Sequence, residues 1–196
     1  MIYSLRGTVL EVTPSFCAIE VNGIGYQIGI SLQSYQKLQK DAQAFLFISQ
    51  IIREDANLLF GFISKEERVL FNLLLSVSGV GPSSALIMLS SLSIEEIIEA
   101  ISSGNSVLLQ KVKGIGAKTA QRIVIDLRDK IQILGEVSFK DPLMGSSLES
   151  VKQEALKALE VLGISRKITE KATEKILLST PDIKLEELVK QILRNL

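Results

Sequence analysis

A repeated glycine-containing bend in the middle of the chain constrains the fold more than any other feature. One copy is LSVSGVGPSSA at residues 75–85, and the other is LQKVKGIGAKTA at residues 109–120. Each copy has an apolar segment, then a glycine, an apolar residue and a glycine, then a second segment with alanine four residues after the second glycine. Two copies in register predict two helical hairpins, because such a repeat is one supersecondary element used twice.

Each position of the bend has a physical role. The first glycine ends a helix and lets the chain turn with positive φ, while the apolar residue fills the gap between the two helices. The second glycine leaves backbone N–H groups bare at the start of the next helix, where these orphan donors and the helix dipole favour a phosphate. This helix-hairpin-helix pattern contacts the DNA backbone rather than the bases. The candidate residues are Gly79, Val80 and Gly81 in the first copy and Gly114, Ile115 and Gly116 in the second. A β-branched side chain at Gly116 is expected to damage the site through backbone strain.

Charge is segregated along the chain, although 22 basic and 22 acidic residues cancel overall. Six basic residues fall within residues 111–130, against two acidic ones. A local basic surface is what phosphate binding requires. We therefore add Ser83, Lys118, Thr119 and Arg122, which follow the second glycines, to the candidate DNA-binding residues.

Other interpretations of the bends fit less well. A purely structural helical hairpin stays open for either copy alone. A dinucleotide-binding loop needs a third glycine where Ser84 stands, and no Gly-x-x-x-x-Gly-Lys frame exists. A helix-hairpin-helix DNA glycosylase would use a lysine and an aspartate, which Lys118 and Asp126 superficially supply, but no aromatic base pocket is evident. A general duplex-binding or protein-docking module is the remaining alternative.

The composition removes several classes of chemistry. The chain has no histidine and one cysteine, Cys17, which excludes Ser-His-Asp and Cys-His catalysis and histidine- or thiolate-based metal sites. We expect Cys17 to be a buried, inert thiol, and we expect no cofactor and no catalytic activity of the chain's own. Neither a signal peptide nor a membrane-spanning segment is evident, so the expected location is the cytoplasm.

The first 63 residues are predicted to form a small barrel. Five short apolar or alternating runs separated by turn signals indicate strands, and Asn22-Gly23 is a strong hairpin turn. So many strands in so short a segment favour an OB-fold. The strands are expected at 3–12, 16–21, 25–30, 44–52 and 57–63, with a short helix at 31–39.

Helical spacing of apolar residues begins at Ser64 and predicts an all-α domain at 64–134. Ser64 with Glu67, and Ser93 with Glu96, fit capping boxes at the starts of two helices.

The remainder of the chain is predicted to be a linker and a small helical domain. Residues 135–147 contain a proline, two glycines and three serines, which is typical of a linker. Three short amphipathic segments at 148–162, 166–178 and 185–196 predict a three-helix domain at 148–196. The expected fold class is therefore α+β with several domains.

Adjacent carboxylates, Glu54 and Asp55, lie in the turn between the last two predicted strands. A solvated turn is the ordinary interpretation, and repulsion of phosphate is the functional one. As nuclease metal ligands they would need further carboxylates converging nearby.

These features together resemble the RuvA family of bacterial subunits that bind Holliday junctions, and the resemblance covers essentially the whole chain. Its most specific stretches are REDANLLFGF at 53–62 and ERVLF at 67–71. The opening MIYSLRG, the turn NGIGY at 22–26, GVGP at 79–82 and GIGAKTA at 114–120 also match.

The resemblance implies a non-catalytic DNA-binding role in recombination and DNA repair. A homotetramer, or an octamer of two tetramers, would hold the arms of an open, square-planar junction, with Glu54 and Asp55 as an acidic pin at the crossover. The UBA-like three-helix tail would recruit RuvB, the hexameric ATPase that drives branch migration, and the RuvC resolvase is a further implied partner. Ile164 is a candidate RuvB contact, with core packing as an equal alternative.

Two positions depart from the family pattern. Ser83 and Ala117 stand where the family often carries lysine. We expect fewer side-chain contacts to phosphate and weaker or more salt-sensitive binding, although the backbone N–H sites remain and four copies add avidity.

Overall fold

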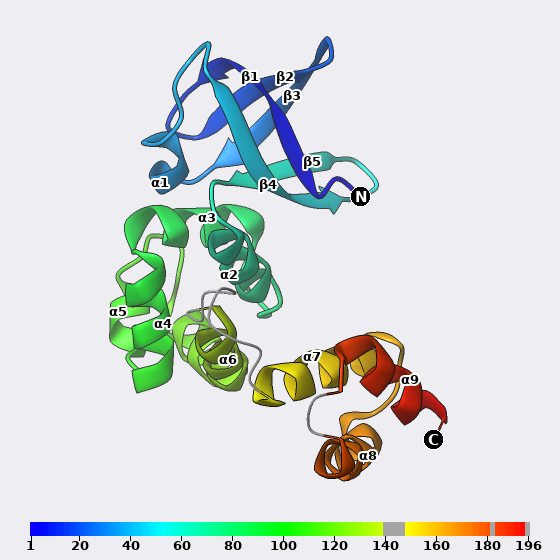
Figure 1. The fold of residues 1–196 in the computed structure, drawn as a ribbon. Coiled ribbons are helices and arrows are strands. Elements are labelled where there is room, and N and C mark those ends of the chain that lie inside the picture. Colours follow the sequence, from blue (N-terminus) through cyan, green and yellow to red (C-terminus); the bar gives the residue numbers. More distant parts are fainter. Residues whose placement is uncertain (139–147, 181–182, 195–196) are drawn as a thin grey trace. The chain divides into compact units, whose positions relative to one another are not determined.

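The computed structural model describes residues 1–138, 148–180 and 183–194. The chain folds into two compact units, Met1–Phe139 and Lys140–Leu196 (Figure 1). The first unit contains the predicted barrel and both glycine bends, and the second contains the three helices of the tail.

Five strands form a closed barrel in the order β1-β2-β3-β5-β4. Neighbouring strands pair antiparallel, except for the parallel pair β3 and β5. This small closed barrel confirms the predicted OB-fold. The strands are β1 (Ser4–Val12), β2 (Phe16–Val21), β3 (Ile24–Ile30), β4 (Gln43–Ile52) and β5 (Asn57–Phe62).

The barrel follows local signals in the sequence. Asn22 and Gly23 have φ of 51° and 81°, which confirms the predicted hairpin turn between β2 and β3. Alternate strand residues point inward, and Cys17 is fully buried among them. Burial raises the pKa of the Cys17 thiol to about 11, so this thiol stays protonated at neutral pH, as expected of an inert core residue.

Of the described helices of the first unit, the first lies between β3 and β4, and the others follow β5 in the predicted all-α segment. These helices are α1 (Leu32–Tyr35), α2 (Lys65–Leu75), α3 (Pro82–Ser91), α4 (Ile94–Ser103), α5 (Ser106–Gln110) and α6 (Ala117–Ser138). The first is shorter than the expected 31–39, with Ser31 as its N-cap. At α4, Ser93 and Glu96 form both bonds of the predicted capping box.

Helix α6 is longer than the sequence suggested. It continues to Ser138, so the first four residues of the segment expected to be a linker, 135–147, are helical. A single glycine inside a helix costs only about 1 kcal/mol relative to alanine, and Gly135 alone does not end a helix already fixed by buried Ile123, Leu127 and Ile131. Residues 139–147 lie outside the described part of the chain.

The barrel interior and the helices of the first unit have separate hydrophobic clusters, and the end of β5 joins the cluster of the helices. Phe60 and Phe62 of β5 pack on Phe71 of α2, with ring centroids 5.1 and 4.9 Å apart. The same hydrophobic cluster extends through α3, α4 and α5 to α6. The β4–β5 turn and the glycine bends therefore belong to one compact body.

One predicted capping box is only half formed, because its glutamate has a different partner. Ser64 Oγ accepts a hydrogen bond from Glu67 N at 3.1 Å, but the Glu67 carboxylate accepts from the hydroxyls of Ser31 and Ser34 instead. Glu67 is only 4% exposed, and desolvation raises its pKa although both serine hydrogen bonds oppose the shift. The side chain thus ties α2 to the barrel.

The second unit is a three-helix bundle, as predicted. Its helices are α7 (Leu148–Val161), α8 (Arg166–Ser179) and α9 (Leu185–Arg194). Ala155, Leu159, Leu188 and Ile192 form its fully buried centre. No described helix has the length and apolar character needed to cross a membrane.

Candidate nucleic-acid interface

The two glycine bends have the same backbone geometry. Gly79 and Gly114 have φ of 93° and 90°, which confirms the predicted positive φ at both first glycines. The apolar residue between the glycines is buried in each bend, with Val80 7% and Ile115 4% exposed. Its N–H donates to the carbonyl three residues earlier at 3.1 Å in both copies. The repeat in the sequence is therefore a repeat in structure.

The second glycines are present for a different reason. Neither Gly81 nor Gly116 has a positive φ, and a Cβ built on either would meet nothing within 4 Å. Gly81 is the N-cap of α3 and makes no side-chain cap bond. Neither strain nor internal packing demands glycine here, so the missing side chain serves to leave the helix N-terminus open. Close approach of a phosphate needs that opening.

This geometry corrects one expectation. We expected a β-branched residue at Gly116 to act through backbone strain, but the backbone there is one that other residues adopt without strain. Such a side chain would instead project into the open space in front of α6. Its effect should fall on ligand access and not on folding.

The two bends touch each other. A Cβ built on Gly79 would lie 3.7 Å from Thr119 Oγ1, and one built on Gly114 would lie 3.7 Å from Ser84 Oγ. Each first glycine therefore faces the third residue of the helix that begins in the other hairpin. Because the contact is reciprocal, the open N-termini of α3 and α6 belong to neighbouring parts of one surface.

Basic side chains follow the second bend but not the first. Lys118 is exposed in the first turn of α6, whereas the equivalent position in α3 holds exposed Ser83. Arg122, one turn after Lys118, is also exposed, but its Nη1 donates to Ser78 O at 3.1 Å. The second hairpin thus carries the side-chain charge, and one of its cations bonds to the first hairpin.

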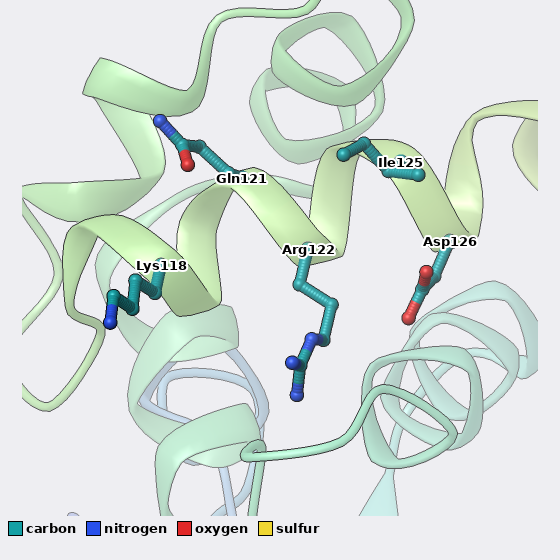
Figure 2. A pocket seen from close by; sticks show the side chains of 5 residues that line it. All are labelled: Lys118, Gln121, Arg122, Ile125 and Asp126. Atoms are coloured by element: carbon teal, nitrogen blue, oxygen red, sulfur yellow. The ribbon is translucent and has the colours of Figure 1, made fainter.

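A shallow hollow of about 330 Å³ lies along α6. Figure 2 shows Lys118, Arg122 and Asp126 spaced one turn apart along the helix, with Gln121 and Ile125 on the same stretch of it. These five residues line the hollow. Lys118 and Asp126, the pair that a glycosylase would use, do share this hollow, but none of its lining residues is aromatic. It therefore offers no ring for stacking an extruded base.

The acidic residues sit at the tip of the β4–β5 hairpin. Arg53 N donates to Ala56 O at 2.7 Å and closes the turn, leaving Glu54 and Asp55 exposed between them. Among the described residues, neither carboxylate takes part in an ion pair. The part of the chain that the structure describes also contains no group of three or more side chains placed to hold a metal ion.

Ile164 follows a helix C-terminus in the second unit. Gly163 has φ of 85° and donates to Glu160 O, while Ile164 N donates to Leu159 O, both at 3.0 Å. These are the two bonds of a Schellman motif, which places an apolar residue after the glycine against the preceding helix. Ile164 is half-buried and packs on the bundle core, whereas Leu162 is 61% exposed.

The sequence patterns do not single out two contacts at this surface. Ser84 is not among the predicted site residues, although aligning the two copies pairs it with Thr119, which is. That alignment was the available signal. The bond from Arg122 to Ser78 joins residues 44 apart in the chain, and no pattern in the sequence indicates it.

Comparison with known proteins agrees with this geometry over the whole chain. Three family models match: RuvA N terminal domain at residues 1–61, SAM-like helix-hairpin-helix tandem at residues 71–129, and RuvA C-terminal domain at residues 150–196. Proteins named Holliday junction branch migration complex subunit RuvA from Christiangramia forsetii and Flavobacterium psychrophilum are each 44% identical to this chain. The one from Bacteroides thetaiotaomicron is 41% identical, and all three alignments cover the full length of both chains. The chain therefore belongs to the RuvA family.

Proposed function

We propose that this chain binds four-way DNA junctions as a homotetramer, holds them open, and recruits a RuvB ATPase that drives branch migration in recombination and repair. The chain itself breaks and makes no bonds, and it acts in the cytoplasm. The proposal is supported by membership of the RuvA family, whose named relatives are subunits of a branch migration complex.

One observation carries the DNA-binding part of the proposal. The open N-termini of α3 and α6 are adjacent, because the two glycine bends touch. Bare N–H groups at a helix start attract phosphate, so two neighbouring sites can hold two phosphates of one duplex arm. The direct ligands that we propose are the backbone groups of Gly79, Gly81 and Ser83 and of Gly114, Gly116, Lys118 and Thr119, with the Lys118 side chain adding charge. Val80 and Ile115 belong to the same site but fix the shape of the bends, because their N–H groups already donate within them.

The acidic turn supplies the preference for a junction. Two exposed carboxylates without an ion-pair partner among the described residues repel phosphate. Repeated around the axis of a tetramer, Glu54 and Asp55 would keep the crossover strands apart and favour the open, square-planar form.

The remaining parts of the chain have separate roles in this proposal. Residues 1–63 form the pin-bearing barrel, 64–138 the DNA-binding segment, which includes all of α6, 139–147 the connection, and 148–196 the domain that docks on RuvB. The half-buried position of Ile164 favours core packing over direct contact, and the exposed apolar side chains of Leu162 and Ile168 are the better candidates for that contact. RuvC, and a second tetramer on the junction, would bind the assembled complex.

Electrophoretic mobility shifts test the central claim. A four-way junction should bind more tightly than a linear duplex of the same total length, because four arms engage four subunits at once. Equal affinity for the two DNAs would contradict junction recognition. Sedimentation should show a tetramer at micromolar concentration, whereas a monomer would favour a general duplex-binding module.

The pin has its own test. Replacing both carboxylates, Glu54→Gln with Asp55→Asn, should tighten junction binding at low salt, since repulsion is removed. The matched control is the neutral change Asn57→Ala at the start of β5, which alters the same hairpin without altering its charge. Weaker or unchanged binding by the pin variant would contradict the repulsion.

A further inference from the structure

One contact breaks the symmetry between the two hairpins. Arg122 belongs to α6 of the second hairpin, yet its Nη1 donates to the carbonyl of Ser78, directly before Gly79 in the first hairpin, at 3.1 Å. The position in the first copy that is equivalent to Arg122 holds Ile87, which has no donor. The bond therefore runs in one direction only.

The accepting carbonyl is suited to a cation. It lies two residues beyond Ser76, the C-cap of α2, and a cation is stabilised near the negative end of a helix dipole. A bond from a guanidinium to such a carbonyl is charge-assisted and stronger than a neutral one. Figure 2 shows Arg122 extending away from α6 between Lys118 and Asp126.

We infer that Arg122 is a positioning residue that holds the first glycine bend in place. On this account its main partner is protein, and it increases DNA affinity by fixing the N-terminus of α3 beside that of α6. The inference rests on the proposed DNA binding, since it assigns how one part of that surface is organised.

The first bend has a structural need for such support. Its helix begins with Pro82, which has no N–H, and Ser83 provides no charge. Fewer donors remain to hold a phosphate, so their placement matters more. The reciprocal contact of Gly79 with Thr119 and of Gly114 with Ser84 limits how far the bends approach, and the Arg122 bond keeps them from separating.

Hydrogen exchange of backbone amides, measured without DNA, distinguishes this positioning role from direct phosphate binding. The N–H of Val80 donates to Val77 O, and the N–H of Ile115 donates to Val112 O, both at 3.1 Å. In Arg122→Ala, NMR should find faster hydrogen exchange at the Val80 amide. The exchange rate at Ile115 and the melting temperature should stay unchanged. If Arg122 only bound phosphate, its removal would leave the exchange rates of both amides unchanged in the absence of DNA.

Salt dependence of duplex binding gives a second, independent measure. Arg122→Ala should weaken binding about tenfold, the scale of one hydrogen bond to a charged group, without changing the slope of log K against log salt. Lys118→Ala, which removes a proposed phosphate contact, should instead reduce that slope by about 0.9 per site. Arg128→Ala, on the same helix two turns later, is the charge-matched control and should change neither measure.

Arg122→Lys decides between the two accounts. Lysine keeps the charge but has a shorter side chain with a single donor group, so exchange at Val80 should stay fast and affinity should stay low. The inference is overturned if Arg122→Lys restores affinity, if Arg122→Ala lowers the salt slope, or if exchange at Val80 does not change. A different result would be that the unmodified chain binds junction and duplex equally while Arg122→Ala still speeds exchange at Val80. That result would overturn the proposed junction binding and leave the positioning role of Arg122 standing.

Discussion

The two hairpins have one backbone and two different sets of side chains. Both turn at a glycine with φ near 90°, and both leave the start of the next helix open. After the bend, however, the first copy has Pro82 and Ser83 where the second has Ala117 and Lys118. The comparison shows that the bend itself depends on backbone conformation, while the strength of each phosphate site is set separately by the residues that follow.

The largest effect should come from closing the second site. Gly116→Val places a branched side chain in the open space before α6, and should cost about 1.5–3 kcal/mol of duplex binding, the scale of a lost hydrogen bond to a charged group. The same change at Gly81 should cost less, because the first site has fewer donors. Fluorescence anisotropy with a labelled duplex measures both.

Folding supplies the control for those two variants. Neither position has a positive φ or a close neighbour, so thermal unfolding of Gly116→Val and Gly81→Val should change only by the small loss, about 1 kcal/mol or less, that a poorer N-cap residue brings. A large drop in melting temperature would show that the second glycines are needed for the fold.

The first glycines should behave in the opposite way. Gly79→Ala and Gly114→Ala force a side chain into the left-handed region, which costs about 1–2 kcal/mol per residue. Chemical denaturation should show similar losses for the two, because their φ values differ by only a few degrees. Clearly unequal losses would contradict the structural equivalence of the bends.

Exchanging the side chains after the bends should make the two sites more alike. Ser83→Lys gives the first site the charge that Lys118 gives the second, and should tighten duplex binding while raising the salt slope by about 0.9 per subunit. Ser83→Gln is the uncharged control of comparable length and should change the slope little. If a salt titration found no increase in the slope for Ser83→Lys, this position would not face DNA.

Much of this arrangement could be predicted because it depends on local signals. The glycine spacing predicted both bends and their positive φ, and alternating apolar runs predicted the barrel strands to within a residue or two. The sequence did not predict bonds between distant segments. Glu67 fits a capping box by its spacing from Ser64, yet its carboxylate bonds to Ser31 and Ser34, more than thirty residues away.

The same limit explains the error at α6 and the reassignment of Arg122. A glycine is a weak local signal to end a helix, and burial of the preceding turns outweighs it. A basic residue beside a glycine bend is equally suited to a phosphate or to a carbonyl of the neighbouring bend. Only the packing of the two hairpins decides between these partners.

The smallest effect concerns how the first hairpin is tied to the barrel. Its first helix, α2, is held through Glu67, whose pKa is raised by burial above the ordinary value of 4.5. A carboxyl with a raised pKa binds its proton more readily in the folded than in the unfolded chain. Its contribution to stability is therefore greatest below pH 4.5 and declines as the pH rises toward the folded-state pKa.

Glu67→Gln removes this dependence, because the amide does not ionise. Its unfolding free energy relative to the unmodified chain should increase as the pH rises above about 4.5, and denaturation at several pH values measures it. Glu66→Gln, the exposed neighbour on α2, removes the same charge without the burial and is the matched control. Since α2 leads into the first bend, pH should affect exchange at Val80 more than at Ile115. If both amides responded equally, Glu67 would not distinguish the hairpins.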